Sequence, residues 1–194
     1  MTGSSVLPVT IYKGKLLFLF GKENPKESGA KGFSDFGGGV EKGESIYETA
    51  MREGGEELTG FLGDGKNLRK LIKRNGGHYN VSFEDYHVHL FYIPYDPNLV
   101  TYYNLNHTFL WERMDKNVLN ESKLFEKIKI QWFDVPSANR RMSEFRSFYQ
   151  HVLRQILKQE KQILHFIKRK CLRKNTKRTI LPMGNKRRTI KHDV

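Results

Sequence analysis

Short apolar segments separated by turn residues dominate the first quarter of the chain. Residues 6–12 and 15–23 are β-prone and flank Lys13-Gly14, so they predict a β-hairpin. Proline and glycine punctuate residues 24–32, which predicts a loop. Further along, a similar apolar pattern predicts a second hairpin, formed by residues 78–83 and 87–95. Two more strands are predicted at residues 108–114 and 128–135.

Other segments repeat their apolar residues every three or four positions, which is typical of helices. Residues 45–58 show this spacing, and Ser45 with Glu48 has the form of a capping box, so a helix should start at Ser45. Residues 67–74 predict a short helix. Residues 138–172 predict a long amphipathic helix that is interrupted near Glu160.

Strands and helices are mixed without a regular strand-helix alternation, and we find no internal repeat. This pattern predicts an α+β fold, an α/β/α sandwich around a mixed sheet. With 194 residues, 38% of them hydrophobic, the chain has enough apolar material for one core. We expect one domain over residues 1–150, the long helix packing on it or extending from it, and a basic tail over 173–194.

The net charge of +13 is concentrated near the end of the sequence. Residues 168–194 hold eleven Lys and Arg and one Asp. Three interpretations stay open for this segment: a solvated end, a nuclear localisation signal, or an arm for nucleic acid. In the last case its cations would neutralise phosphates and release counterions. The charge therefore fits a polyanionic partner without identifying one.

Several classes of protein are disfavoured. No apolar run approaches the roughly 18 residues of a membrane span, so we expect no membrane partner. The N-terminus lacks the layout of a signal peptide. Cys171 is the only cysteine, which excludes an internal disulfide and favours a reducing intracellular compartment, the cytoplasm or alternatively the nucleus. The sequence sets no oligomeric state.

Residues 35–60 gather carboxylates in an otherwise basic chain. Gly37, Gly38 and Gly39 lead as a flexible segment into the predicted helix. On that helix Glu53, Glu56 and Glu57 share one face, where like charges repel. Two of them stand near the helix C-terminus, where the helix dipole disfavours anions. A hard divalent cation would relieve this conflict, since carboxylate and carbonyl oxygens are the ligands that Mg²⁺ prefers.

The same stretch resembles the motif of the Nudix hydrolases, G-x5-E-x7-R-E-U-x-E-E-x-G-U, where U is aliphatic. The residues in register are Gly38, Glu44, Arg52, Glu53, Glu56 and Glu57. Gly54 departs from the motif by replacing an aliphatic residue, and the last glycine comes one position late, at Gly60. The resemblance extends over about residues 5–150, and three segments are most similar to a branch found in large DNA viruses: LFLFGKEN, SDFGGG and REGGEELTGFLG.

This resemblance implies a Nudix-type fold and a pyrophosphohydrolase that uses Mg²⁺ or Mn²⁺. Its substrate would be a phosphoanhydride, a nucleoside diphosphate linked to another moiety, with capped RNA among the candidates. The implied metal ligands are a carbonyl of Gly37 or Gly38 and the carboxylates of Glu53, Glu56, Glu57 and, from another loop, Glu126. Glu44 would pair with Arg52 and hold the helix face in place. We assign substrate contacts to Lys22, Gly37, Gly38 and Gly39.

Other readings of the sequence are weaker. The alternative function is a non-catalytic Nudix-fold module that binds nucleic acid through its basic tail. The glycines complete neither a dinucleotide fingerprint nor a phosphate-binding loop of the Walker type. We interpret His87 and His89 as ordinary strand residues. Three aromatic residues that could stack on a base are interpreted as core: Tyr102, Tyr103 and Trp111.

Overall fold

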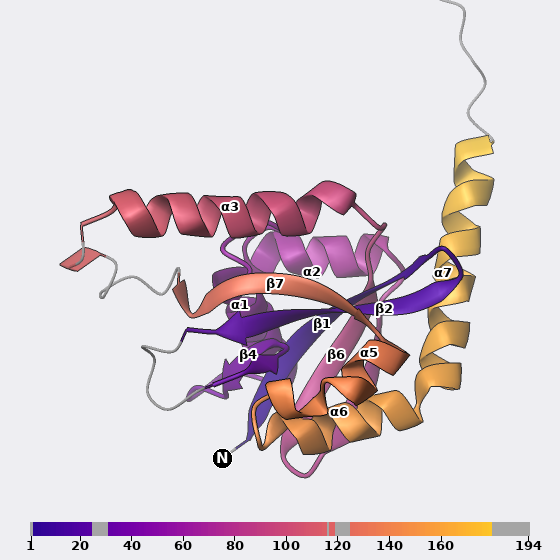
Figure 1. Cartoon of the computed structure of the whole chain (residues 1–194). Coiled ribbons are helices and arrows are strands. Elements are labelled where there is room, and N and C mark those ends of the chain that lie inside the picture. The colour runs from indigo at the N-terminus through magenta and orange to yellow at the C-terminus, as the bar shows by residue number, and fades with distance from the viewer. Residues whose placement is uncertain (1, 25–30, 116, 119–124, 180–194) are drawn as a thin grey trace, which may run out of the picture.

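The computed structural model describes residues 2–24, 31–115, 117–118 and 125–179. Residues 180–194, most of the predicted basic tail, lie outside the described residues. The described chain forms a seven-stranded sheet between two layers of helices (Figure 1). The predicted α+β class, with a mixed sheet between helices, is therefore confirmed.

The sheet has the strand order β3-β2-β1-β6-β5, with β4 also paired to β1 and β7 to β2. Strands β1 and β6 run parallel, whereas the other pairs are antiparallel. Both predicted hairpins are present, as β1–β2 and β5–β6. The strands are β1 Gly3–Tyr12, β2 Lys15–Glu23, β3 Phe33–Ser34, β4 Phe36–Gly39, β5 His78–Phe83, β6 Tyr86–Tyr92 and β7 Lys127–Asp134.

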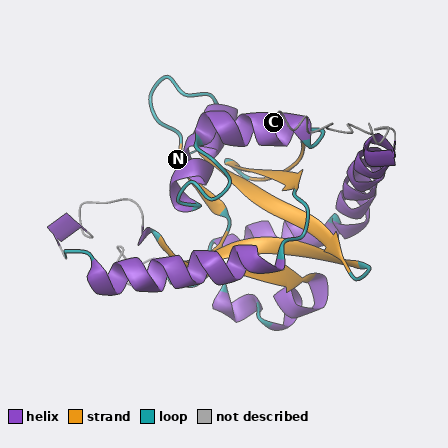
Figure 2. Ribbon diagram, turned by 90° about the horizontal axis from the view of Figure 1, so that it is seen from above, coloured by secondary structure: helices purple, strands orange, loops and turns teal. Residues whose placement is uncertain are grey.

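Each face of the sheet buries its own core, because side chains alternate between the faces along a strand. On β2, Phe18 and Phe20 enter one core and Leu19 enters the other. The Leu19 core lies under helices α1 Ile46–Glu57, α2 Gly65–Arg74 and α3 Pro97–Arg113. The Phe18 core lies under α5 Val135–Arg140, α6 Tyr149–Lys158 and α7 Glu160–Thr179, and Figure 2 shows helices on both sides of the strands.

Helix α1 starts and ends as its sequence dictates. Ser45 is its N-cap, and its side chain and that of Glu48 form the predicted capping box. At the other end the N–H groups of Thr59 and Gly60 donate to carbonyls of the last turn, the bonding pattern of a Schellman motif. Thr59 has φ +48°, so it adopts the left-handed conformation at the position where the Nudix motif has glycine.

Gly54, the other departure from the motif, has a packing reason. A Cβ built on Gly54 would lie 2.4 Å from Cγ2 of Val6 and 2.9 Å from Cδ2 of Leu68. Helix α1 therefore approaches β1 and α2 more closely than an aliphatic residue would allow. The carboxylates of α1 are held close to the sheet as a result.

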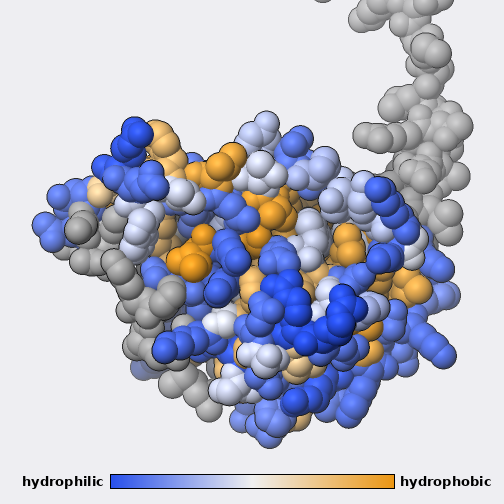
Figure 3. Space-filling model, viewed as in Figure 1, coloured by the Kyte–Doolittle hydropathy of each residue, from blue (hydrophilic) through white to orange (hydrophobic). Residues whose placement is uncertain are grey.

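The strand predicted at residues 108–114 is wrong, because this segment belongs to α3. Asp96 caps that helix by accepting from the N–H of Asn98, and Pro97 follows in the first turn. A short apolar run does not distinguish a strand from a helix segment. Tyr102, Leu105 and Phe109 are exposed on α3, and Figure 3 shows hydrophobic residues over this helix on a largely hydrophilic face.

The single long helix predicted for residues 138–172 is also wrong. The segment forms α5, the short 3₁₀ helix η2 (Met142–Glu144), α6 and α7. Phe145 has an extended backbone and pairs with Phe33, so the chain cannot continue as a helix there. The predicted interruption near Glu160 is confirmed, since α6 ends at Lys158 and α7 begins at Glu160.

Two smaller findings complete the fold. The triple glycine is not a flexible lead-in but forms most of strand β4, which pairs with β1 in the register Gly3–Gly39, Ser4–Gly38 and Ser5–Gly37. Among the helices that the structure describes, none is both long and apolar enough to span a membrane.

Candidate active site

Strand β4 and helix α1 lie against each other, which places the glycines beside the carboxylates. A Cβ on Gly38 would lie only 2.4 Å from Oε1 of Glu53. A Cβ on Gly37 would meet Ser5 and the carbonyl oxygen of Ser4 at 2.3 and 2.4 Å. Both positions therefore need glycine, Gly38 to make room for the Glu53 carboxylate and Gly37 to allow pairing with β1.

Arg52 is the centre of an ion-pair cluster on the outer face of α1. Its Nε and Nη2 lie 2.8 and 3.0 Å from the two carboxylate oxygens of Glu44. Its Nη1 lies 2.7 Å from Oε1 of Glu53 and 3.5 Å from Oε2 of Glu56. Hydrogen bonds from Arg52, then from Thr49, lower the pKa of Glu44 to about 2. The predicted contact between Glu44 and Arg52 is confirmed.

Glu57 points the other way, into the protein. Its side chain is only 4% exposed. Its Oε2 accepts from the N–H of Gly37 at 2.7 Å, and its Oε1 lies 3.1 Å from Nζ of Lys127. Burial raises the pKa of Glu57 well above its ordinary value, Lys127 opposes the rise, and the nearby carboxylates of Glu23 and Glu126 add to it. Glu126 therefore lies close enough to act on Glu57 electrostatically.

Lys127 is a buried cation that sequence reasoning missed. Its side chain is 1% exposed, and its ammonium donates to a carboxylate oxygen of Glu23 and to Oγ of Ser34. Burial lowers the pKa of Lys127, but the neighbouring carboxylates of Glu57 and Glu23 outweigh burial, so the net shift is upward. Lys127 thus links strand β2 to the candidate metal site.

Asp35, between β3 and β4, is the second buried charge that the sequence did not reveal. It accepts hydrogen bonds from Oγ of Ser5 and from the hydroxyl of Tyr86. Burial raises its pKa to about 6, against these hydrogen bonds and the charge of Lys127. A signal was present, since Asp35 precedes the glycines directly, but nothing in the local pattern set it apart from a turn aspartate.

The residues fit a divalent cation in part. Among the described residues no three His, Cys, Asp or Glu side chains are grouped closely enough to hold a metal ion. Glu53 and Glu56 nevertheless converge on one cationic nitrogen of Arg52. Oxygen donors that share one cation in this way are the donor set that Mg²⁺ or Mn²⁺ takes. Glu57 stands apart, since both of its oxygens accept from N–H donors.

A cavity of about 260 Å³ opens beside strand β4, and we call it the glycine hollow. The residues that matter in its lining are Gly37, Gly38, Gly39, Tyr86, Arg146 and Phe148. Arg146 is held by Glu23, whose Oε1 lies 3.1 Å from its Nη1. The glycines predicted to contact substrate therefore share a cavity with a guanidinium group that the sequence did not single out.

Lys22, the other predicted substrate contact, lies elsewhere. Its ammonium lies 6.0 Å from the ring centroid of Phe33, and its side chain lines a separate cavity with Glu144. The structure does not bring Lys22 into the lining of the glycine hollow. Its contact with substrate stays a prediction.

The remaining candidates take structural places. The Nδ1 atoms of His87 and His89 lie 3.0 Å from Oγ of Ser82 and 2.8 Å from Oδ1 of Asn80. Tyr103 is buried, and its hydroxyl donates to the carbonyl of Glu57. The expectation of core packing is confirmed for Tyr103 but wrong for Tyr102, which is 61% exposed because the helix turns it outward.

Comparisons with known proteins give a likeness to solved structures only. No family model matches the chain, and no curated protein matches it. An Ap4A hydrolase of C. elegans is 14% identical, with a TM-score of 0.44 over 80% of this chain and 96% of that chain. A MutT/Nudix family protein from Listeria innocua is 14% identical, with a TM-score of 0.46 over 85% and 96%. A Nudix hydrolase from M. smegmatis, RenU, is 9% identical, with a TM-score of 0.39 over 80% and 84%.

Proposed function

We propose that this protein is a Nudix-type hydrolase that cleaves a phosphoanhydride bond with the help of Mg²⁺ or Mn²⁺. The observation that carries the proposal is the convergence of Glu53 and Glu56 on one guanidinium nitrogen of Arg52, directly beside Gly38. These residues are the ones in register with the Nudix motif. Carboxylates gathered against a glycine strand suit a cation that is shared between protein and phosphate.

Glu53 and Glu56 are the side chains that would hold the cation, with the carbonyl of Gly38 as a further oxygen donor. Behind them Glu57 accepts from the N–H of Gly37 and pairs with Lys127, which would hold strand β4 against helix α1. When bound, the cation would stabilise the charge that develops on phosphoryl oxygens during hydrolysis. Arg52, paired with both oxygens of Glu44, would fix the position of Glu53.

The protein's own groups suit the remaining tasks of the reaction. Arg146 lines the glycine hollow and offers guanidinium N–H donors to a phosphate. In the reaction a water oxygen bonds to phosphorus, and the bridging P–O bond breaks. The proton of the water passes to a carboxylate. Glu56, whose side chain is 34% exposed against 14% for Glu53, is the more accessible acceptor.

For the substrate we propose a nucleoside diphosphate linked to another moiety, with capped RNA as the finer candidate. The net charge of +13 suits a polyanion, and residues 168–194 supply eleven of the Lys and Arg. The alternative, a binding module without turnover, shares this charge argument. The two differ in whether the carboxylate cluster is needed.

A hydrolysis screen tests the proposal. Three proteins are compared: wild type, Glu56→Gln and Glu48→Gln. Each is incubated with nucleoside diphosphate-linked compounds and with capped RNA, in the presence of Mg²⁺ or Mn²⁺. We expect Glu56→Gln to cut turnover by roughly 10²-fold or more, a typical loss when a charge-stabilising group is removed. Glu48→Gln removes the same charge from the same helix but keeps the capping box, so its turnover should equal that of wild type.

The outcomes separate the two functions. Folded Glu56→Gln protein that turns over like wild type would contradict the metal-site assignment. Binding of RNA by wild type without hydrolysis of any compound, in either metal, would favour the binding module.

A further inference from the structure

A second cavity adjoins the glycine hollow, and its lining has a different chemistry. This cavity of about 360 Å³, here called the aromatic hollow, is lined mainly by Phe83, Glu84, Asp85, Tyr86, Phe148 and His151. Tyr86 and Phe148 line both hollows, so the two are neighbours. The volume falls in the range of about 300–1,000 Å³ that is common for small-molecule sites.

The aromatic side chains of this hollow contact one another in two pairs. The rings of Phe83 and His151 are nearly parallel, with an interplanar angle of 11° and centroids 5.7 Å apart. The ring of Phe148 meets that of Tyr86 edge-on, with centroids 5.7 Å apart. Phe148 is 44% exposed. An exposed aromatic face of this kind can stack on a planar ring.

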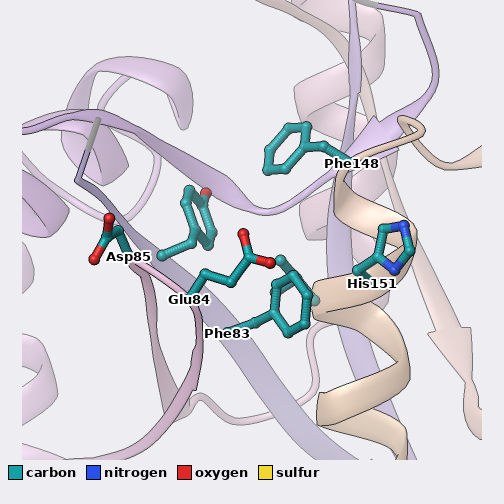
Figure 4. Close-up of a pocket in the computed structure, with 7 residues that line it drawn as sticks. Phe83, Glu84, Asp85, Phe148 and His151 are labelled. Carbon is teal, nitrogen blue, oxygen red and sulfur yellow. The ribbon is translucent and has the colours of Figure 1, made fainter.

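One carboxylate gives the hollow a polar end. Glu84 and Asp85 form the two-residue turn between β5 and β6. Figure 4 shows the carboxylate of Glu84 directed between the rings of Phe83 and Phe148, while Asp85 lies at the edge of the hollow. An ionised carboxylate only accepts hydrogen bonds, so the ligand has to present donors to it.

We propose that the aromatic hollow is a guanine site: the base stacks on Phe148, and Glu84 accepts from its Watson–Crick edge. Guanine alone among the common bases carries two adjacent donors on that edge, the N1–H and the N2 amino group. Adenine and cytosine present one amino group next to an acceptor nitrogen, and uracil presents one N–H between two carbonyls. One carboxylate can therefore accept two parallel hydrogen bonds from guanine only.

The neighbouring glycine hollow then receives the phosphates. Arg146 lines the glycine hollow, and its guanidinium lies 5.0 Å from the ring centroid of Phe148, which lines both hollows. A guanosine nucleotide with its base on Phe148 would direct its phosphates past Arg146 towards Gly38 and the carboxylates of α1. This orientation rests on the proposed function, whereas the base site itself does not.

Binding measurements without a divalent cation test the base site separately from hydrolysis. Affinities for GDP and ADP are measured by calorimetry in EDTA for wild type, Glu84→Gln, Asp85→Asn and Phe148→Ala. We expect wild type to prefer GDP by about tenfold, the lower end for a bidentate base contact. Phe148→Ala should weaken GDP binding by about tenfold through the lost stacking. Phe148 is partly exposed, so we expect this variant to fold, and circular dichroism checks this.

Asp85→Asn is the matched control, since it removes the same charge from the same turn. Glu84→Gln should abolish the preference for GDP, and Asp85→Asn should keep it. Equal loss in both variants, or equal affinity of wild type for GDP and ADP, would overturn the proposal. An N7-methyl-GDP arm separates two sources of the base: tighter binding of the methylated, positively charged base indicates an RNA cap, and equal binding indicates a plain guanosine nucleotide.

Hydrolysis and binding can fail independently. Hydrolysis of phosphoanhydrides without a guanine preference in binding would overturn the base site and leave the proposed function intact. A guanine preference that depends on Glu84, without hydrolysis of any compound, would support the base site and contradict the proposed function.

Discussion

The ammonium of Lys127 lies 3.1 Å from a carboxylate oxygen of Glu57, and both side chains are buried. The same ammonium contacts Glu23, which also pairs with Arg146, so Lys127 is the cation that the two buried carboxylates share. This pair ties the last residue of helix α1 to strand β7. It also holds one carboxylate of the Nudix motif away from the partly buried cluster around Arg52.

Removing Lys127 should destabilise the fold strongly. Lys127→Met leaves Glu23 and Glu57 buried without their shared cation, a change that typically costs about 3–5 kcal/mol. Urea unfolding measures the loss. Lys129→Met is the matched control, because it removes the same charge from the same strand at a less buried position. If the two variants unfold at the same urea concentration, the buried pair is not the stabilising element that its geometry indicates.

Substitutions at the two glycines Gly37 and Gly38 of β4 should have different effects, one on catalysis and the other on stability. Gly38→Ala places a methyl group 2.4 Å from the position of the Glu53 carboxylate, which is the free end of a flexible side chain and can move aside. We expect a folded protein whose phosphoanhydride hydrolysis falls by about 10²-fold, as for a misplacement of about 1 Å at a reacting centre. Turnover at several Mg²⁺ concentrations, beside thermal unfolding, measures both effects.

Gly37→Ala is the partner experiment with the opposite expectation. Its methyl group would lie 2.4 Å from the carbonyl oxygen of Ser4 and 2.3 Å from Cβ of Ser5, so backbone atoms must shift. We expect a loss of about 1–3 kcal/mol in the free energy of unfolding, the usual cost of overpacking. A stable Gly37→Ala protein together with an unfolded Gly38→Ala protein would contradict the geometry of β4 against α1.

Local rules allowed part of this structure to be predicted. The capping box of Ser45 and the spacing of Glu44 and Arg52 depend on neighbours within one turn or one loop, and both are present as expected. Lys127 could not be predicted, because a register shift in the pairing of β2 with β7 falls next to it. Such a bulge changes which face a side chain takes, and strict alternation does not show it.

Non-local pairing explains the other misses. The chain around Phe145 reads as helical, but its backbone pairs with Phe33, more than a hundred residues earlier. The burial of Asp35 depends on Tyr86 and Ser5, which distant strands bring to it. The aromatic hollow likewise combines the β5–β6 turn with helix α6, and no sequence spacing links the two.

Asp35 should make stability depend on pH. Burial raises its pKa from 3.8 to about 6 in the folded protein. The folded state thus holds a proton that the unfolded state releases, and stability falls as pH rises through this window. A rise in pKa from 3.8 to about 6 corresponds to about 3 kcal/mol, and the decline should be complete above about pH 6. Asp35→Asn cannot lose the proton and should lack this decline.

Urea unfolding of wild type and Asp35→Asn at pH 4 and pH 7 measures the effect. Relative to wild type, Asp35→Asn should be more stable at pH 7 than it is at pH 4. Asp134→Asn is the control of opposite sign, since hydrogen bonds from Ser137 lower the pKa of Asp134 to about 2. The stability that Asp134 contributes is lost only as pH falls from about 4 towards 2, so its variant should show no added change between pH 4 and 7. If the difference in unfolding free energy between wild type and Asp35→Asn is the same at pH 4 and pH 7, the folded protein does not hold a proton on Asp35.

Thr59 adopts a backbone conformation that suits glycine, and replacing it should stabilise the protein. Its φ of +48° places a β-branched residue in the left-handed region, which costs an L-residue roughly 1–2 kcal/mol. Glycine carries no such penalty but loses more freedom on folding, so the net gain of Thr59→Gly should be about 1 kcal/mol or less. Thr59→Ala keeps the Cβ and therefore most of the strain, and it should gain little. Chemical unfolding of the three proteins gives the ranking. The carboxylates of helix α1 all precede Thr59, and the Schellman bonds from residues 59 and 60 use only backbone atoms, so hydrolysis should stay unchanged in both variants. A lower stability of Thr59→Gly would mean that the threonine side chain stabilises the end of α1 by more than its backbone strain costs.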